Sequence, residues 1–133
     1  MRHDGPDPRI PPHAEALTMT DACLFCRIVA GEIPSTKVHE DDLVLAIRDI
    51  APQAPTHVLV MPRAHVASVA DLTDADAALL GRLFAVTAEI ARAEGIEAAG
   101  YRVVANHGRA AGQSVDHLHL HLLGGRDLAW PPG

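Results

Sequence analysis

Residues 112–125 read Gly112-Gln113-Ser114-Val115-Asp116-His117-Leu118-His119-Leu120-His121-Leu122-Leu123-Gly124-Gly125, and they decide how the rest of the sequence is interpreted. The alternation of His and Leu predicts a β-strand over residues 115–123, because successive side chains of a strand point to opposite faces. His117, His119 and His121 would then share one face, and the intervening leucines would share the other. We expect the leucine face to pack on a helix and the histidine face to line a site.

The segments before this strand predict an α+β domain with a mainly antiparallel sheet, one long helix and one short N-terminal helix. The predicted elements are a short helix over 24–30, strands over 42–47 and 57–61, a long helix between Thr73 and Gly95, and a strand over 101–105. The 133 residues are 48% hydrophobic, which is enough for one compact domain, placed at residues 20–133. Residues 1–19 are rich in proline and polar residues and are expected to form a disordered tail.

The composition also excludes several classes of protein. A net charge of -6 disfavours general nucleic-acid binding. No apolar run approaches the roughly 18 residues of a membrane span, and the N-terminus does not resemble a secretory signal. Cys23 and Cys26 are the two cysteines, too few for a disulfide scaffold, so a reduced cytoplasmic location is expected.

Nine histidines stand against two Phe, one Trp and one Tyr, so the alternating histidines need an explanation. They could form a polar strand face without a role, a three-histidine metal site, or a nucleophilic site for chemistry at phosphorus. The flanking residues favour the third interpretation. In Gly112-Gln113-Ser114 the glycine permits a close backbone approach, and the exposed N–H groups and the Ser114 hydroxyl can bind phosphate oxygens. Asn106 adds a neutral amide donor.

The run from His117 to Leu123 resembles the signature of the histidine-triad (HIT) family, in which three histidines alternate with apolar residues. The similarity extends over about residues 23–133 and is strongest to the Hint-like branch, the purine nucleoside phosphoramidases. The other segments that carry it are Gly31-Glu32-Ile33-Pro34, Asp49-Ile50-Ala51-Pro52-Gln53-Ala54-Pro55-Thr56-His57, Gly124-Gly125-Arg126 and Trp130-Pro131-Pro132-Gly133.

The resemblance implies a HIT-like fold and a role for each catalytic residue. His119 would attack the α-phosphorus and form a nucleotidyl-histidine intermediate, while the backbone carbonyl of His117 holds its other ring nitrogen. His121 would contact phosphate and meet His57, and Ser114 would serve the leaving-group nitrogen.

The resemblance also implies a set of nucleotide-binding residues around these catalytic groups. Phosphate contacts would come from Asn106, Gly112, Gln113, Ser114, His119 and His121. Asp49 would bind the ribose hydroxyls, and an apolar slot for the purine would comprise Leu24, Phe25, Ile28, Ile50 and Leu59. The chemistry would require no cofactor, and the protein would form a homodimer with a continuous sheet.

The pair Cys23 and Cys26 has Cys-x-x-C spacing, which is a weak signal alone. A redox motif would need a thioredoxin-like context, and a structural zinc site would need two further ligands. In similar bacterial histidine-triad proteins such a pair binds zinc with two distant histidines, and the matching positions here are His65 and His117. Structural zinc is therefore expected, with two buried, unbound thiols as the alternative.

The predicted function is hydrolysis of purine nucleoside phosphoramidates of the AMP-lysine type, with the purine nucleoside monophosphate as product. One alternative is a dinucleoside polyphosphate hydrolase, and another is a nucleotide-binding interaction module without catalysis. Arg48, His107 and Asp116 depart from residues common in the family, which leaves the substrate preference open.

Overall fold

The computed structural model describes residues 23–133, which contain all the residues predicted to form the site. The tail predicted over residues 1–19 lies outside the described residues, as do residues 20–22 of the predicted domain.

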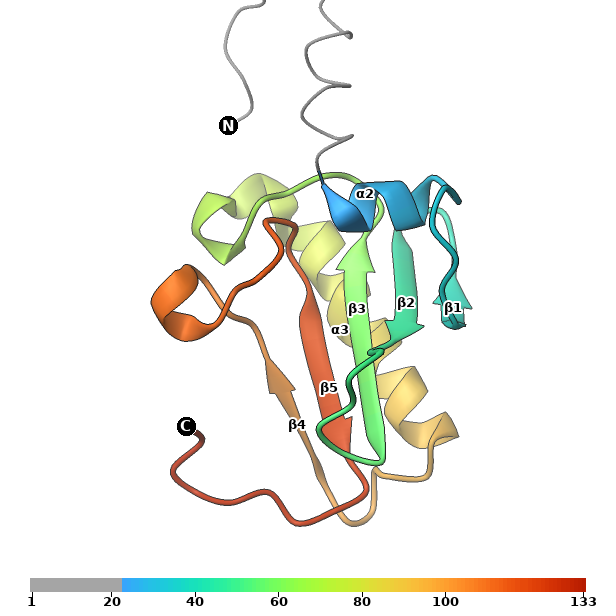
Figure 1. Cartoon of the computed structure of the whole chain (residues 1–133), viewed down its shortest axis with the longest axis vertical. Coiled ribbons are helices and arrows are strands. Elements are labelled where there is room, and N and C mark those ends of the chain that lie inside the picture. Colours follow the sequence, from blue (N-terminus) through green and yellow to red (C-terminus); the bar gives the residue numbers. More distant parts are fainter. Residues whose placement is uncertain (1–22) are drawn as a thin grey trace, which may run out of the picture.

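The described chain forms a five-stranded sheet with one long helix and several short helical segments (Figure 1). In chain order the elements are α2 Leu24–Val29, β1 Lys37–Glu40, β2 Val44–Arg48, β3 Thr56–Pro62, the 3-10 turns η1 Val69–Asp71 and η2 Asp74–Asp76, α3 Ala77–Ala93, β4 Tyr101–Val104, the 3-10 turn η3 Arg109–Ala111 and β5 Leu120–Gly124. The strand order is β1-β2-β3-β5-β4, and every neighbouring pair is antiparallel. The predicted α+β class is confirmed.

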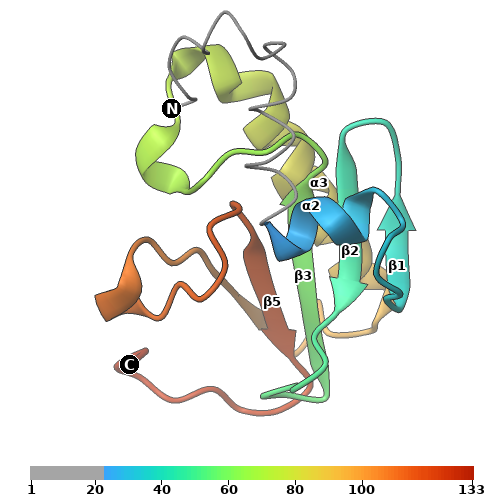
Figure 2. The same ribbon diagram turned by 45° about the horizontal axis from the view of Figure 1, so that its top comes forward.

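The sheet separates two apolar clusters, as the alternation of strand side chains requires. On one face, Val44, Val58, Val60, Leu120 and Leu122 pack with α3. On the other face, residues of β2 and β3 pack with α2; they are Leu45, Ile47, Leu59 and Met61. Figure 2 shows α2 in front of the sheet and α3 behind it. The histidine-bearing face of β5 therefore lies on the side of α2.

Local capping explains where the helices begin. Thr73 and Asp76 form a capping box at the turn that leads into α3. The Thr73 hydroxyl accepts the N–H of Ala75, and the Asp76 carboxylate accepts the N–H of Thr73. Cys23 precedes α2, and its sulfur accepts a hydrogen bond from the backbone N–H of Cys26. Gly31 and Gly95 follow the two helices with φ of 82° and 73°, a conformation that favours glycine.

Three predicted strands differ at their ends. The strand predicted over 42–47 is β2, Val44–Arg48, because the Asp41 carboxylate accepts the N–H groups of Leu43 and Val44 in a turn. The strand predicted over 57–61 extends by one residue at each end as β3, and the one predicted over 101–105 is β4, Tyr101–Val104. Strand β1 was not predicted, since Lys37-Val38-His39-Glu40 contains a single apolar residue.

The prediction of a strand over 115–123 is wrong at its start, because β5 begins at Leu120. Pro62, at the end of the neighbouring strand, has no N–H to donate to a longer ladder. Leu118 instead donates its N–H to the Val66 carbonyl at 2.6 Å, and His117 donates to the Val115 carbonyl at 2.8 Å. Only His121 of the three histidines therefore belongs to the strand.

Two ion-pair networks join the sheet to α3 and its end. Arg48, at the end of β2, binds the Glu94 carboxylate through two nitrogens at 2.6 and 2.8 Å. Arg82 of α3 reaches Asp41, which also bonds His39. Across residues 23–133 no helix has the length and apolar character needed to cross a membrane.

Candidate active site and candidate metal centre

The three histidines lie on the same side of the sheet, as predicted, although two of them precede the strand. The Phe25 ring of α2 meets His119 edge-on, with centroids 4.9 Å apart, and meets His117 at 6.0 Å. The His121 ring lies beside that of His119, with centroids 4.9 Å apart and the planes tilted by 57°. The predicted leucine face is confirmed, because Leu118, Leu120 and Leu122 are buried in the cluster that contains α3.

His119 has a defined proton position. Its Nδ1 lies 2.7 Å from the carbonyl oxygen of His117, so Nδ1 carries the hydrogen and donates it. The neutral ring then keeps a lone pair on Nε2. Burial lowers the pKa of His119 below its ordinary value, against a smaller raising effect from the His117 carbonyl. The ring is therefore uncharged near neutral pH, the form in which imidazole is a nucleophile.

His57 and His121 form a second pair beside His119. They lie diagonally across the ladder between β3 and β5, where His57 is opposite Leu123 and His121 is opposite Leu59. Their Nε2 and Nδ1 atoms are 2.9 Å apart, and the Asp49 carboxylate is 3.4 Å from His57 Nε2. Burial is the largest cause that lowers the pKa of His121 to about 4, and burial also lowers the pKa of His57.

The loop that precedes the triad is tied together by Gln113. The carbonyl of its side chain accepts the Gly108 N–H at 2.9 Å, and its amide nitrogen donates to the carbonyls of Ala67 and Val115. Gly112 has a φ of 93°, which allows the chain to turn just before Gln113. A phosphate contact from the Gln113 side chain would break these bonds, so the side chain organises the loop. Its predicted role in phosphate binding stays a prediction.

Two other residues predicted to contact phosphate have polar groups that could bind it. Neither the Ser114 hydroxyl nor the Asn106 amide has a hydrogen-bond partner among residues 23–133. Ser114 is exposed and Asn106 is half-buried. His107, one of the departures from the family pattern, bonds the buried Ser68 hydroxyl at 2.8 Å and so connects this loop to η1.

The predicted purine slot is divided between the core and the surface. Phe25, Ile28 and Leu59 are buried in the cluster beneath α2. Ile50 is fully exposed and Leu24 is 44% exposed. Asp49, the predicted ribose ligand, keeps one oxygen on the Ala51 N–H in a tight turn. The structure therefore does not bring the five apolar residues into one cluster.

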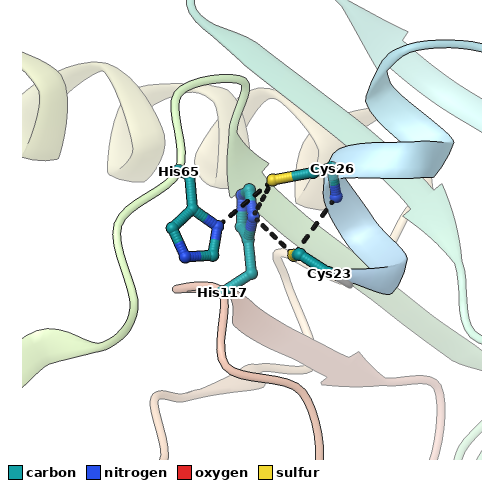
Figure 3. Close-up of side chains that lie close together, drawn as sticks. All are labelled: Cys23, Cys26, His65 and His117. Carbon is teal, nitrogen blue, oxygen red and sulfur yellow. Dashed lines mark hydrogen bonds between the residues drawn. The ribbon is translucent and has the colours of Figure 1, made fainter. Parts of the chain in front are cut away.

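The four predicted metal ligands do come together (Figure 3). Cys23 and Cys26 come from the start of α2, His65 from the segment after β3, and His117 from the segment before β5. His117 Nδ1 lies 3.4 and 3.5 Å from the two sulfurs, and His65 Nδ1 lies 3.1 Å from Cys26. All four ligand atoms lie within 4.8 Å of one another. In tetrahedral zinc coordination, sulfur and nitrogen ligands are roughly 3.5 Å apart.

The hydrogen bonds of His117 also suit a ligand role. Its Nε2 donates to the Pro62 carbonyl at 2.8 Å, which leaves the lone pair on Nδ1, the atom that faces the sulfurs. Burial is the main cause that raises the pKa of the Cys26 thiol to about 12. Both cysteines are free thiols. Without a bound cation the Cys26 thiol thus stays protonated, and a metal would have to displace its proton.

The sequence did not indicate that Gln53 contacts the predicted site. Its backbone N–H donates to His57 Nδ1 at 3.0 Å. The segment that contains Gln53 contributed to the family resemblance, but nothing in its residue types signals that a main-chain group reaches the histidine.

Comparison with known proteins agrees with this geometry. The chain matches the HIT domain family over residues 30–128. It is 52% identical to an uncharacterized HIT-like protein of Synechococcus elongatus over 115 residues, which are 86% of this chain and 100% of that protein. It is 48% identical to purine nucleoside phosphoramidase of Escherichia coli over 110 residues, which are 83% of this chain and 92% of that protein.

Among solved structures, a HIT family hydrolase from Legionella pneumophila matches with a TM-score of 0.82 and 52% identity, covering 84% of this chain and 99% of the other. A HIT family hydrolase from Clostridium thermocellum matches with a TM-score of 0.80 and 45% identity, covering 82% and 95%. The resemblance inferred from the histidine run is confirmed. This chain belongs to the HIT domain family.

Proposed function

We propose that this protein hydrolyses purine nucleoside phosphoramidates of the AMP-lysine type, with His119 as the nucleophile. One observation carries the proposal: His119 Nδ1 donates to the His117 carbonyl at 2.7 Å, which leaves Nε2 with its lone pair in a buried, uncharged ring. An imidazole held in this way can attack phosphorus without first losing a proton. The name of the Escherichia coli relative supports the same substrate class.

The reaction would proceed in two displacements at phosphorus. In the first, His119 Nε2 forms a bond to the α-phosphorus and the P–N bond breaks, so the amine departs with the bonding electron pair. The amine needs a proton, and the exposed Ser114 hydroxyl is the group assigned to deliver it. In the second, water attacks the same phosphorus and the P–Nε2 bond breaks; one proton of the water returns to Ser114, and the products are the nucleoside monophosphate and the neutral imidazole.

The substrate would be bound by neutral donors and one carboxylate. Asn106 and Ser114, which have no partner among residues 23–133, would donate to phosphate oxygens, and His121 would do so from β5. Asp49 would accept hydrogen bonds from the ribose hydroxyls. The exposed side chains of Leu24 and Ile50 would cover the purine, with Leu59 beneath them.

We also propose that Cys23, Cys26, His65 and His117 hold a structural zinc ion, supported by the fit of their spacing to tetrahedral coordination. When bound, the zinc would supply only a cross-link between α2 and the segments that carry His65 and His117. The side chain of His117 would serve this centre while its carbonyl holds His119. The same residue would thus connect the two sites.

A homodimer and a cytoplasmic location complete the proposal. Strand β4 is at the edge of the sheet, so its outer backbone groups could pair with a second copy and continue the sheet. Two free thiols suit a reducing compartment. Light scattering coupled to gel filtration would test the dimer, and a monomer at all concentrations would contradict it.

The decisive experiment compares wild-type protein with His119→Ala. The variant should lose turnover of an adenosine phosphoramidate while still binding AMP in calorimetry. A matched control is His39→Gln, which lies on β1 and contacts Asp41, and it should keep full activity. Near-wild-type activity of His119→Ala would refute the mechanism. A higher kcat/KM for a diadenosine polyphosphate than for the phosphoramidate would instead favour a dinucleoside polyphosphate hydrolase.

A further inference from the structure

Asp49, His57 and His121 form a second cluster whose ligand atoms lie within 4.8 Å of one another. By residue type, two imidazoles and a carboxylate could hold a metal ion. The hydrogen bonds around His57 indicate a different role, because they determine which ring nitrogens carry protons.

Two hydrogen bonds link Gln53, His57 and His121 in series, and the first of them comes from the backbone. The N–H of Gln53 donates to His57 Nδ1 at 3.0 Å. An amide N–H can only donate, so His57 Nδ1 must be the acceptor and carries no hydrogen. A neutral His57 therefore has its hydrogen on Nε2.

The second bond passes this constraint to His121. His57 Nε2 lies 2.9 Å from His121 Nδ1, so the Nε2 hydrogen is donated and His121 Nδ1 accepts it. A neutral His121 must then carry its own hydrogen on Nε2. The series of hydrogen bonds thus runs from the Gln53 N–H through His57 to His121 and ends at the His121 Nε2–H.

We propose that the backbone N–H of Gln53 makes His57 a positioning residue that holds His121 as a neutral Nε2–H donor to a phosphate oxygen. The identity of the acceptor rests on the proposed function, whereas the placement of the protons rests on the hydrogen bonds alone.

Gln53 is well held for this purpose. Its carbonyl accepts two hydrogen bonds from the Arg126 guanidinium, at 3.0 and 2.9 Å. Its side-chain amide donates to the Ala51 carbonyl at 2.9 Å. The residue is therefore fixed on both sides of the N–H that faces His57, which is 5% exposed.

The arrangement also opposes a positive charge on the pair. A further proton would bind either at His57 Nδ1, where it would face the Gln53 N–H, or at His121 Nδ1, where it would face the His57 Nε2–H. Of the charged and titratable groups around the pair, Asp49 favours the protonated rings, while His119 disfavours protonation of His121. Burial is the largest influence on both rings and lowers the pKa of each. A metal bound at His57 Nε2 would likewise have to remove the hydrogen that His121 accepts.

The primary test is long-range ¹H–¹⁵N correlation NMR of the imidazoles in the full-length, nucleotide-free protein. His57→Gln and His121→Gln would assign the two rings. We expect both to be neutral Nε2–H tautomers between about pH 6 and pH 8, a range in which ordinary histidines titrate. An Nδ1–H tautomer or an imidazolium signal from either ring in this range would overturn the proposal.

A pair of variants separates the N–H from the side chain of Gln53. Gln53→Ala keeps the N–H and loses only the side-chain bond to the Ala51 carbonyl, so both tautomers should persist and kcat/KM should fall much less than in Gln53→Pro. Gln53→Pro removes the N–H and should give mixed His57 tautomers and a kcat/KM lower by about 10- to 150-fold, the effect of one hydrogen bond to a charged group. Unchanged tautomers in Gln53→Pro would refute the role of the main chain.

His57→Leu provides a second route if Gln53→Pro does not fold. The Leu variant should release His121 into a mixture of tautomers and lower kcat/KM, whereas His57→Gln, whose amide can donate to His121, should be less impaired. Equal activity of the two variants would contradict a positioning role. If the tautomers are as expected but the wild type cleaves no phosphoramidate, the proposed function fails and the proton placement stands. If cleavage occurs with other tautomers, the inference fails alone.

Discussion

Replacing Gly124 by alanine should destabilise the fold by a local and calculable clash. Gly124 ends β5 and is buried, opposite Thr56 and Tyr101 in the sheet. A Cβ atom at this position would lie 2.6 Å from Ile96 Cδ1 and 3.1 Å from Ile96 Cβ. Ile96 is 5% exposed and belongs to the cluster packed on α3, so it has little room to move away. We expect the free energy of unfolding to fall by about 1–3 kcal/mol, the usual cost of overpacking.

A second substitution tests whether this contact is the cause. Ile96→Val removes Cδ1, the atom at 2.6 Å, and alone should cost about 0.5–1.5 kcal/mol. The double variant should lose less stability than the sum of the two single losses, by about 0.5 kcal/mol or more, because the valine relieves part of the clash.

The matched control is the same substitution on a helix. Gly81 lies inside α3, and a Cβ added there meets nothing within 4 Å. Gly81→Ala should therefore raise the free energy of unfolding by about 0.5–1 kcal/mol, through reduced backbone entropy. Urea unfolding followed by circular dichroism, at one protein concentration, measures all four variants. A Gly124→Ala protein as stable as wild type, or strict additivity with Ile96→Val, would refute the reasoning.

Three further predictions concern an ion pair, the metal centre and the leaving group. Arg48 is the main cause that lowers the pKa of Glu94, so the pair stabilises the fold at neutral pH and its contribution is lost as the pH falls through the folded-state pKa. Glu94→Gln should thus lower the free energy of unfolding in urea by about 1 kcal/mol at neutral pH, a modest value because Arg48 is 39% exposed. The same substitution should cost almost nothing in strong acid, and an equal cost at both pH values would contradict the pairing. Wild-type protein should contain one zinc per chain by elemental analysis and lose thermal stability when a chelator removes it. Cys26→Ser should bind zinc more weakly, and its thermal stability should respond less to the chelator. Wild-type protein that neither binds zinc nor responds to the chelator would argue against the metal centre. Ser114→Ala should slow cleavage of alkylamine phosphoramidates by at least about tenfold, as expected for loss of proton donation, but should spare an aryl phosphate ester whose leaving group needs no proton; equal slowing of both substrates would exclude this role.

The sequence was sufficient wherever a short-range pattern decided the structure. The period of two in Leu118, Leu120 and Leu122 correctly placed these side chains against the long helix. Thr73 correctly marked the entry to that helix, since its capping box involves residues only three positions apart. The four candidate metal ligands were brought together by family resemblance, because no local pattern connects Cys23 with His117, 94 positions later.

Features that depend on distant backbone groups were not predictable. The late start of β5 follows from the Val66 carbonyl, which takes the Leu118 N–H, and from the missing N–H of Pro62. No local pattern indicated that the Gln113 side chain bonds the Ala67 carbonyl, 46 residues away in the sequence. The resemblance assigned Ile50 to an apolar slot for the purine; the turn made by Asp49 leaves its side chain fully exposed, and the assignment stays a prediction.

The position of β5 has a consequence for how the protein is made. This strand is the last element in the chain, yet it lies between β3 and β4 in the sheet. While a ribosome is still adding residues, β4 has no strand to pair with and one edge of β3 is bare, which favours association between unfinished chains. A transcript truncated before Leu120 would encode no partly active enzyme, since the same residues complete the sheet and supply His121. Closure of the sheet and assembly of the histidine cluster therefore occur in one step, when β5 takes its place between β3 and β4.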